Sequence, residues 1–198
     1  MLIGLTGGIA TGKSTVSGLL QNMGAIIVDA DEVSRDVVAP NSEGLSALVE
    51  VFGSGILTAD GQLNRTQLGT LVFSSPDKRK ALERILHPLI ARESTARIAA
   101  ALSENPPWVI YDAALLIESG RAADFRPLIV VTTDSQTQCH RLMKRDGLSR
   151  DEAMARINAQ MPLEEKARHG DYVLENSGPV HETESQLKAI LLQIEASK

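Results

Sequence analysis

The sequence predicts an α/β fold of three layers, in which a five-stranded parallel sheet is flanked by helices. Short apolar runs alternate with segments of helical periodicity, as they do when buried parallel strands are joined by crossover helices. The chain has 198 residues, of which 43% are hydrophobic and only 3% aromatic. This composition is sufficient for one substantial aliphatic core. The expected strands are residues 2–6, 25–28, 108–111, 128–132 and 172–174.

The first expected strand leads directly into a phosphate-binding loop. The loop reads Gly7-Gly8-Ile9-Ala10-Thr11-Gly12-Lys13-Ser14, which fits G-x-x-x-x-G-K-[ST], and apolar residues at helical spacing follow it. Glycines let such a loop curl so that its N–H groups face an anion, and the following helix adds its positive end. Lys13 is expected to reach the outer phosphates of a nucleoside triphosphate, and Ser14 to bind Mg²⁺.

The second and third expected strands are separated by far more chain than one crossover needs. Residues 32–102 are expected to be mostly helical and to form a subdomain for a second substrate. Pro40-Asn41-Ser42 should break its first helix, Asp60-Gly61 should form a turn, and Pro76 should begin another helix. His87-Pro88 should interrupt the pattern before a last long helix.

A second excursion, over residues 135–170, is rich in arginine and lysine and is expected to form a lid. Ser149 and Glu152 form a capping box that should begin a helix, and Pro162 should end it. The whole chain is then one domain, with a core of residues 1–31, 103–134 and 171–198 around the insertion and the lid. A final helix from about His181 should bury the apolar residues Leu187, Ile190, Leu191 and Ile194.

Three aspartates follow expected strands, where ligands of open α/β sheets bind. Asp29 and Asp31 follow the second strand, so either could orient an attacking hydroxyl or lie near Mg²⁺. Alternatively, one of the two aspartates is only a helix cap. If a helix begins here, Asp31 can cap it. Asp112 ends the third strand and could hold magnesium-bound water, or could be a simple turn residue.

Arg141 and Arg145 are four residues apart and therefore share a helix face. Arginines that close over phosphates neutralise charge during phosphoryl transfer. The alternative is a solvated face on which Asp146 and Glu152 pair with them.

Several classes of protein are disfavoured by the composition. A net charge of −5 argues against nucleic-acid binding, and one cysteine, Cys139, excludes an internal disulfide and a cysteine-based zinc site. Lys13 and five glycines interrupt residues 1–20, so no signal peptide is expected, and no run of 18 apolar residues indicates a membrane span. A cytoplasmic protein is expected.

An ordered set of motifs resembles the dephospho-CoA kinase family over almost the whole chain. The motifs include Gly4-Leu5-Thr6 with the phosphate loop, Asp29-Ala30-Asp31 with Arg35 and Val38, Gly61 with Leu63 and Arg65, Leu71-Val72-Phe73, His87-Pro88 with Ile90, Asp112 with Leu115-Leu116 and Glu118, Gln138-x-x-Arg141-x-x-x-Arg145, Arg156-Ile157 with Gln160, Asp171-Tyr172-Val173, and Asn176-x-Gly178. Ala114 stands where the family usually has a proline that would stiffen the turn.

The resemblance implies a nucleoside-monophosphate-kinase-like P-loop fold and phosphorylation of the ribose 3′-hydroxyl of dephospho-CoA by ATP with Mg²⁺. It implies that Asp31 is the base, with Lys13 and Arg141 also catalytic. The ATP-binding residues it implies are Ala10, Thr11, Gly12, Lys13, Ser14, Thr15, Asn176 and Gly178, the last two near adenine. The substrate-binding residues it implies are Asp31, Arg35, Arg65, His87, Asp112 and Leu116. Ser14 would bind Mg²⁺, with Asp29 or Asp112 acting through water. The protein is expected to be a monomer.

Three rival interpretations remain. A nucleoside monophosphate kinase would use the same loop, insertion and lid, but Asp171 to Gly178 and His87-Pro88 favour the family above. A GTPase switch would need [NT]-K-x-D and D-x-x-G, and neither pattern occurs in the chain. The third rival is a regulator that binds ATP without turning it over.

Overall fold

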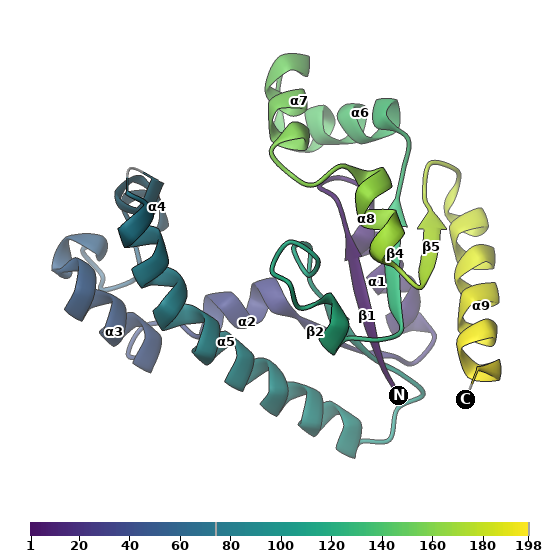
Figure 1. The fold of residues 1–198 in the computed structure, drawn as a ribbon, viewed down its shortest axis with the longest axis horizontal. Coiled ribbons are helices and arrows are strands. Elements are labelled where there is room, and N and C mark those ends of the chain that lie inside the picture. The colour runs from purple at the N-terminus through teal and green to yellow at the C-terminus, as the bar shows by residue number, and fades with distance from the viewer. Residues whose placement is uncertain (74, 198) are drawn as a thin grey trace. The chain divides into compact units, whose positions relative to one another are not determined.

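Five parallel strands form a single sheet in the computed structural model, which describes residues 1–73 and 75–197. The order is β2-β3-β1-β4-β5, so β1 lies at the centre (Figure 1). The strands are β1 (Leu2–Gly7), β2 (Ile26–Asp29), β3 (Val109–Asp112), β4 (Leu128–Thr132) and β5 (Tyr172–Glu175). The predicted sheet is confirmed, and each strand agrees with its predicted range to within one residue at either end.

Contacts divide the chain into two compact units. The sheet unit comprises residues 1–28 and 101–198, and the helical unit comprises residues 29–100. Together with the strands, the sheet unit contains α1 (Lys13–Asn22), α6 (Ser135–Asp146), α7 (Arg150–Asn158), α8 (Leu163–His169), α9 (Val180–Ala196) and the short 3₁₀ helix η2 (Ala122–Asp124).

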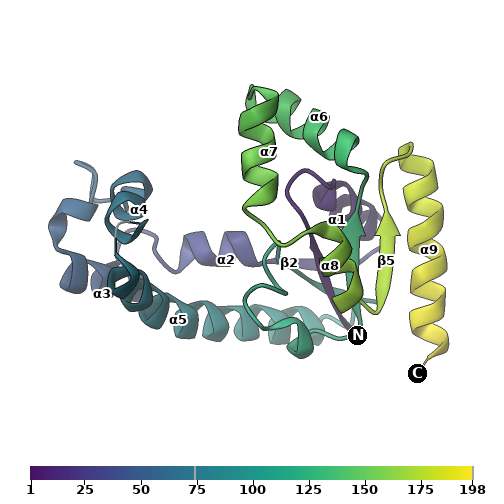
Figure 2. The same cartoon turned by 45° about the horizontal axis from the view of Figure 1, so that its top comes forward.

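The core of the sheet unit is aliphatic, as the composition predicts. Ile3 and Leu5 of β1 are fully buried, and α1 and α9 close over the sheet with apolar faces. Helix α9 lies beside β5 in both ribbon views (Figures 1 and 2). The predicted last helix is confirmed, since Leu187, Ile190, Leu191 and Ile194 are all buried.

The helical unit has its own small core. It contains α2 (Ala30–Asp36), α3 (Glu43–Phe52), η1 (Ser54–Ile56), α4 (Arg65–Phe73) and most of α5 (Pro76–Ser103). Val38, Leu48, Ile56 and Leu68 are buried together. The predicted break at residues 40–42, the turn at Asp60-Gly61 and the start of a helix at Pro76 are confirmed.

The predicted interruption at His87-Pro88 is wrong, because α5 continues through Pro88. Proline removes one backbone N–H donor, which normally disfavours a helix interior. Here Leu82, Ile85 and Leu86, in the turns just before it, pack against the core of the helical unit. Burial of these side chains offsets the lost hydrogen bond, since helix stability in proteins comes mainly from tertiary packing.

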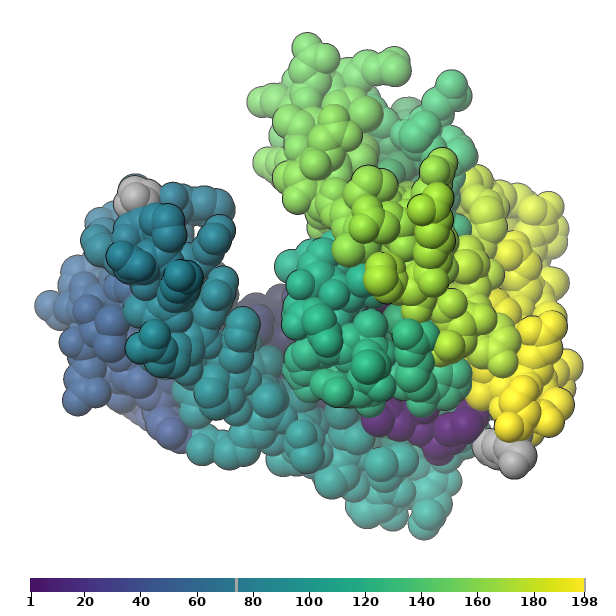
Figure 3. Space-filling view, viewed as in Figure 1, coloured from purple at the N-terminus to yellow at the C-terminus, as the bar shows by residue number. Residues whose placement is uncertain are grey.

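The lid segment contains one more helix than predicted. The capping box of Ser149 and Glu152 begins α7 as expected, but α7 ends at Asn158. Pro162 therefore does not end that helix; it is the N-cap of α8 instead. Proline is well tolerated at a helix start, where its missing N–H would have no partner. In the space-filling view, α6 and α7 project beyond the rest of the sheet unit (Figure 3). In the described part of the chain, no helix has both the length and the apolar character needed to cross a bilayer.

Asp171 ties the start of β5 to β4. Its Oδ2 accepts a hydrogen bond from Leu128 N at 2.7 Å, and its Oδ1 lies 2.8 Å from Arg126 Nη1. Partial burial acts to raise the pKa of Asp171, but the Arg126 guanidinium and the Leu128 N–H together lower it below its ordinary value of 3.8.

Asp171→Asn is expected to lower Tm at pH 7 and to make less difference as the pH falls. Because the pKa is lower in the folded state, the carboxylate stabilises the fold above the unfolded value near 3.8 and loses this effect as pH falls through the folded pKa. Thermal unfolding of both proteins between pH 7 and pH 3 tests this, with the exposed Glu195→Gln as a control for loss of one surface charge. A Tm difference that is constant or grows toward low pH would contradict it.

Candidate active site

The phosphate loop connects β1 to α1 in the strand–loop–helix arrangement that the motif requires. Ala10 and Gly12 have positive φ, of 58° and 87°, which turn the chain tightly. Thr11 is buried, and its hydroxyl donates to Gly8 O at 3.0 Å. Gly12 is the N-cap of α1 and no side chain caps that helix. Thr15 N donates to Gly12 O at 2.9 Å, and the N–H groups of Lys13 and Ser14 before it are available to an anion.

Gly12 is required by a close approach as well as by its backbone conformation. A Cβ at this position would lie 2.1 Å from Asn176 Nδ2. Asn176 is buried; its Nδ2 donates to Thr11 O at 2.8 Å and its Oδ1 accepts from Thr183 Oγ1 at 2.7 Å. Asn176, which directly follows β5, therefore holds the phosphate loop by binding the loop backbone.

Asp112 lies next to the loop because β3 is the sheet neighbour of β1, with Asp112 level with Leu5. Lys13 Nζ forms an ion pair with Asp112 Oδ1. Ser17 Oγ, one helical turn further along α1, donates to Asp112 Oδ2 at 2.6 Å. Both side chains are mostly buried, with 18% of Lys13 and 6% of Asp112 exposed. Lys13 of the motif and Asp112 at the end of β3 are thus joined in one ion pair, which the sequence did not predict.

Two glutamines of the lid segment bind the backbone N–H and C=O groups of Ile9. Gln138 of α6 donates from Nε2 to Ile9 O at 2.8 Å, and Gln160, after α7, accepts from Ile9 N at 2.7 Å. Both glutamines occur in the motifs quoted above, but no chemical pattern in the sequence assigned them a role. Their partner is a backbone group about 130 to 150 residues away, and such pairing has no local signal.

The two lid arginines have different surroundings. Arg141 Nη1 donates to Thr11 O at 3.3 Å, which places it against the phosphate loop. Arg145 instead pairs with Asp146 at 2.7 Å, and this hydrogen bond raises the pKa of the guanidinium. The solvated-face interpretation therefore describes Arg145. Glu152 is not its partner, since its carboxylate closes the capping box with Ser149.

Helix α6, which carries Gln138 and Arg141, begins at a strong cap. Asp134 is its N-cap and accepts from Thr137 N at 2.8 Å. Hydrogen bonds from the side chain and backbone of Thr137, and from Ser177, lower the pKa of Asp134 to about 2. The cap carries its full negative charge at neutral pH and favours the positive end of the helix.

Asp29, rather than Asp31, caps the helix that follows β2. Asp29 Oδ1 accepts from the N–H groups of Asp31, at 2.7 Å, and Glu32, at 3.3 Å. The interpretation that the second aspartate caps this helix is wrong, because Asp29 is the last extended residue and Asp31 already lies in the first turn. Asp31 is exposed.

The residues expected to bind the second substrate fall in both units. Arg35, Arg65 and His87 are exposed in the helical unit, whereas Leu116 is only 2% exposed in the sheet unit. Arg65 lines a largely apolar pocket formed by α2, α4, α5 and the segment before α4. The other residues of this pocket are Ser34, Val38, Leu63, Leu68, Gly69, Val72, Leu82 and Leu86.

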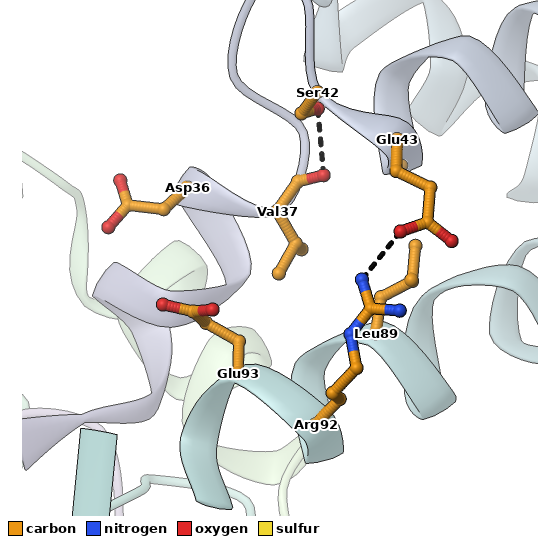
Figure 4. Close-up of a pocket in the computed structure, with 8 residues that line it drawn as sticks. Asp36, Val37, Ser42, Glu43, Leu89, Arg92 and Glu93 are labelled. Atoms are coloured by element: carbon orange, nitrogen blue, oxygen red, sulfur yellow. Dashed lines mark hydrogen bonds and ion pairs between the residues drawn. The ribbon is translucent and has the colours of Figure 1, made fainter. Parts of the chain in front are cut away.

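A second pocket of the helical unit is polar and lies where α2, α3 and α5 meet (Figure 4). Arg92 and Glu43 pair across it at 2.5 Å. Asp36 and Glu93 are both bound by Arg97, at 2.7 and 2.8 Å. The charged side chains of this pocket are therefore paired, and two of these pairs join α5 to α3 and to α2.

The fold and this loop define a P-loop kinase of the small-molecule type. The model of the dephospho-CoA kinase family matches residues 1–182. The chain belongs to the dephospho-CoA kinase family.

Relatives and solved structures resemble this chain over nearly its full length. A dephospho-CoA kinase of Geobacter metallireducens is 48% identical over 190 residues, which cover 96% of this chain and 94% of the relative. A crystal structure of TT1252 from Thermus thermophilus has a TM-score of 0.83 and 34% identity, covering 98% and 97% of the two chains. Dephospho-CoA kinase from Campylobacter jejuni has a TM-score of 0.73 and 26% identity, with the same coverage.

Proposed function

We propose that this protein transfers the γ-phosphoryl group of ATP to the ribose 3′-hydroxyl of dephospho-CoA, which gives CoA and ADP. The observation that carries the proposal is the match to the dephospho-CoA kinase family over residues 1–182, which includes a folded phosphate loop. The relatives of similar length bear the same name.

ATP phosphates would be held by residues Ala10 to Thr15. The N–H groups at the start of α1 supply donors and the helix supplies its positive end. The Lys13 ammonium has three donors, of which the Asp112 pair uses one, so the others can reach the β- and γ-phosphates.

Mg²⁺ fits the oxygen groups that surround this loop. Ser14 is exposed in the first turn of α1, and Asp112 presents a carboxylate beside Lys13. Hydroxyl and carboxylate oxygens are suitable ligands for Mg²⁺, with water completing the shell. Asp112 is better supported than Asp29, because Asp29 is the cap of α2. When bound, the ion would neutralise developing charge on the phosphates.

Asp31 is proposed to orient the 3′-hydroxyl and accept its proton. Its support is its place two residues after β2, since substrates of open α/β sheets bind beyond the carboxyl ends of the strands. The capping role of Asp29 leaves Asp31 as the exposed carboxylate of the pair.

The remaining parts of both substrates are assigned from the family motifs. Asn176 and Gly178 are proposed to lie near the adenine of ATP. Asn176 also donates a hydrogen bond to the backbone of the phosphate loop. Arg35, Arg65 and His87 are proposed to contact dephospho-CoA. Arg65 is the best supported, because an arginine beside an apolar pocket suits a ligand with anionic and apolar parts. Leu116 has the weakest support, since it is buried. A monomeric state, a cytoplasmic location and no binding of nucleic acid stay predictions of the sequence.

ADP release is expected to be fastest with dephospho-CoA and to require Mg²⁺. The measurement is a coupled ADP-release assay over dephospho-CoA, AMP, CMP, dTMP and adenosine, with the phosphorylated position determined by NMR. Turnover of a nucleoside monophosphate that equals or exceeds that of dephospho-CoA would refute the proposal. ATP binding without turnover of any acceptor would favour a regulator.

Asp31→Asn should bind ATP normally but transfer phosphate at least about 100-fold more slowly, because a general base typically contributes about 10²- to 10⁴-fold. Single-turnover kinetics and ATP titration by calorimetry measure the two effects. Asp29→Asn is the matched control: it should lower Tm through loss of the α2 cap and slow transfer less. A dead Asp29→Asn beside a fully active Asp31→Asn would reverse the two roles.

Arg141→Lys should lower kcat by at least about tenfold, since lysine cannot make the planar contact that guanidinium makes with phosphate oxygens. Arg145→Lys is its control on the same helix and should stay within about twofold of the wild type, because Arg145 pairs with its exposed neighbour Asp146. Steady-state kinetics of both variants provide the comparison. No loss in Arg141→Lys would place Arg141 on the solvated face as well, and an equal loss in Arg145→Lys would contradict the assignment of Arg145 to that face.

A further inference from the structure

Lys166 lies at the centre of α8 and its side chain is completely buried. Its Nζ donates to Ala114 O at 3.1 Å and to Gly7 O at 3.4 Å, and it forms an ion pair with Glu118 Oε1 at 2.7 Å. Three acceptors match the three donors of an ammonium group, so the buried charge is fully hydrogen-bonded.

Anchoring α8 alone does not require a lysine. A buried charge carries a desolvation penalty that pairing and hydrogen bonds only partly offset. An apolar side chain of similar length would often hold such a helix equally well. The buried ammonium therefore needs a further explanation. The segments that contain its three acceptors provide one.

These acceptors belong to the two segments that meet at the phosphate site. Gly7 ends β1 and begins the phosphate loop, whereas Ala114 and Glu118 follow Asp112 on the segment after β3. Lys13 and Asp112 form their ion pair between the same two segments. Lys166 thus provides a second connection between them.

Helix α8 is also packed directly against the loop. A Cβ on Gly8 would lie only 2.7 Å from Leu163 Cδ2, so the first turn of α8 touches the loop backbone. Thr6 Oγ1 donates to Ala114 O at 3.3 Å and strengthens the same junction. Movement of the Lys166 side chain would therefore be transmitted to both segments.

We propose that Lys166 is a positioning residue for phosphoryl transfer, which sets the phosphate loop against the Asp112 segment without touching either substrate. The inference rests on the proposed kinase function. Loss of the ammonium should displace Lys13 and Asp112 relative to each other, and small misplacements of catalytic groups can cost on the order of 10²-fold in rate. Binding of ATP should change less, because the N–H groups at the start of α1 stay in place.

The experiment compares three variants of the full chain. Lys166→Met removes the ammonium but keeps the length of the side chain, and leaves Glu118 without its partner. Lys166→Met combined with Glu118→Gln removes both charges and restores neutrality. Lys144→Met, on the exposed face of α6, is the control for loss of one lid lysine. Thermal unfolding, KM for ATP and kcat with saturating dephospho-CoA are measured for each.

The expected result separates stability from catalysis. Lys166→Met should lower Tm by several degrees, and the double variant should recover most of that loss. In both variants kcat should be about 10- to 100-fold below the wild type, with KM for ATP within about threefold. Lys144→Met should match the wild type in all three measurements.

Two outcomes would overturn the inference. A folded double variant with wild-type kcat would show that Lys166 is only structural, and so would failure of both variants to fold, since the ammonium would then be required for the fold itself. Failure of the proposed function has a different signature, because the wild-type protein would then not release ADP with dephospho-CoA.

Discussion

The backbone of the phosphate loop must leave N–H groups available to phosphates, and the surrounding structure depends on this constraint. A loop that directs donors inward needs partners for its carbonyls, since buried backbone groups are rarely left unpaired. The carbonyl of Gly7 accepts from Lys166, that of Ile9 from Gln138, and that of Thr11 from Asn176. These donors lie in α8, in α6 and just after β5, so the C-terminal part of the chain completes a site begun by the N-terminal part.

The order of the strands places the charges around this loop. Because β3 inserts between β2 and β1, the residue that ends β3 lies beside the first turn of α1. Lys13 therefore has a carboxylate partner, Asp112, and is held in one place rather than left to move on a flexible stem. Ser17 binds the other carboxylate oxygen and so fixes the orientation of Asp112. A cation that is already positioned loses less conformational freedom when the phosphates arrive.

Features with a local signal were predictable from the sequence, whereas features that depend on tertiary contacts were not. The strands, the phosphate loop and the capping box at Ser149 each follow from neighbouring residues, and all are observed. Pro88 and Pro162 were misjudged because the effect of a proline depends on its surroundings: one lies within a well-packed helix and the other before a helix. Lys166 appeared as one more lid cation, because nothing in its sequence neighbourhood reveals burial against β1.

The same distinction explains why the charge pattern of the lid could not identify its functional members. Arg141 and Arg145 have the same spacing signal, yet one turn of α6 separates a contact with the loop from a contact with an exposed neighbour. Successive turns of a helix can meet different surroundings, and α6 begins three residues after the carboxyl end of β4. Distance along the helix from its cap at Asp134, rather than charge alone, decides which cation reaches the loop. Lid arginines should therefore be ranked by their turn on the helix as well as by their helix face.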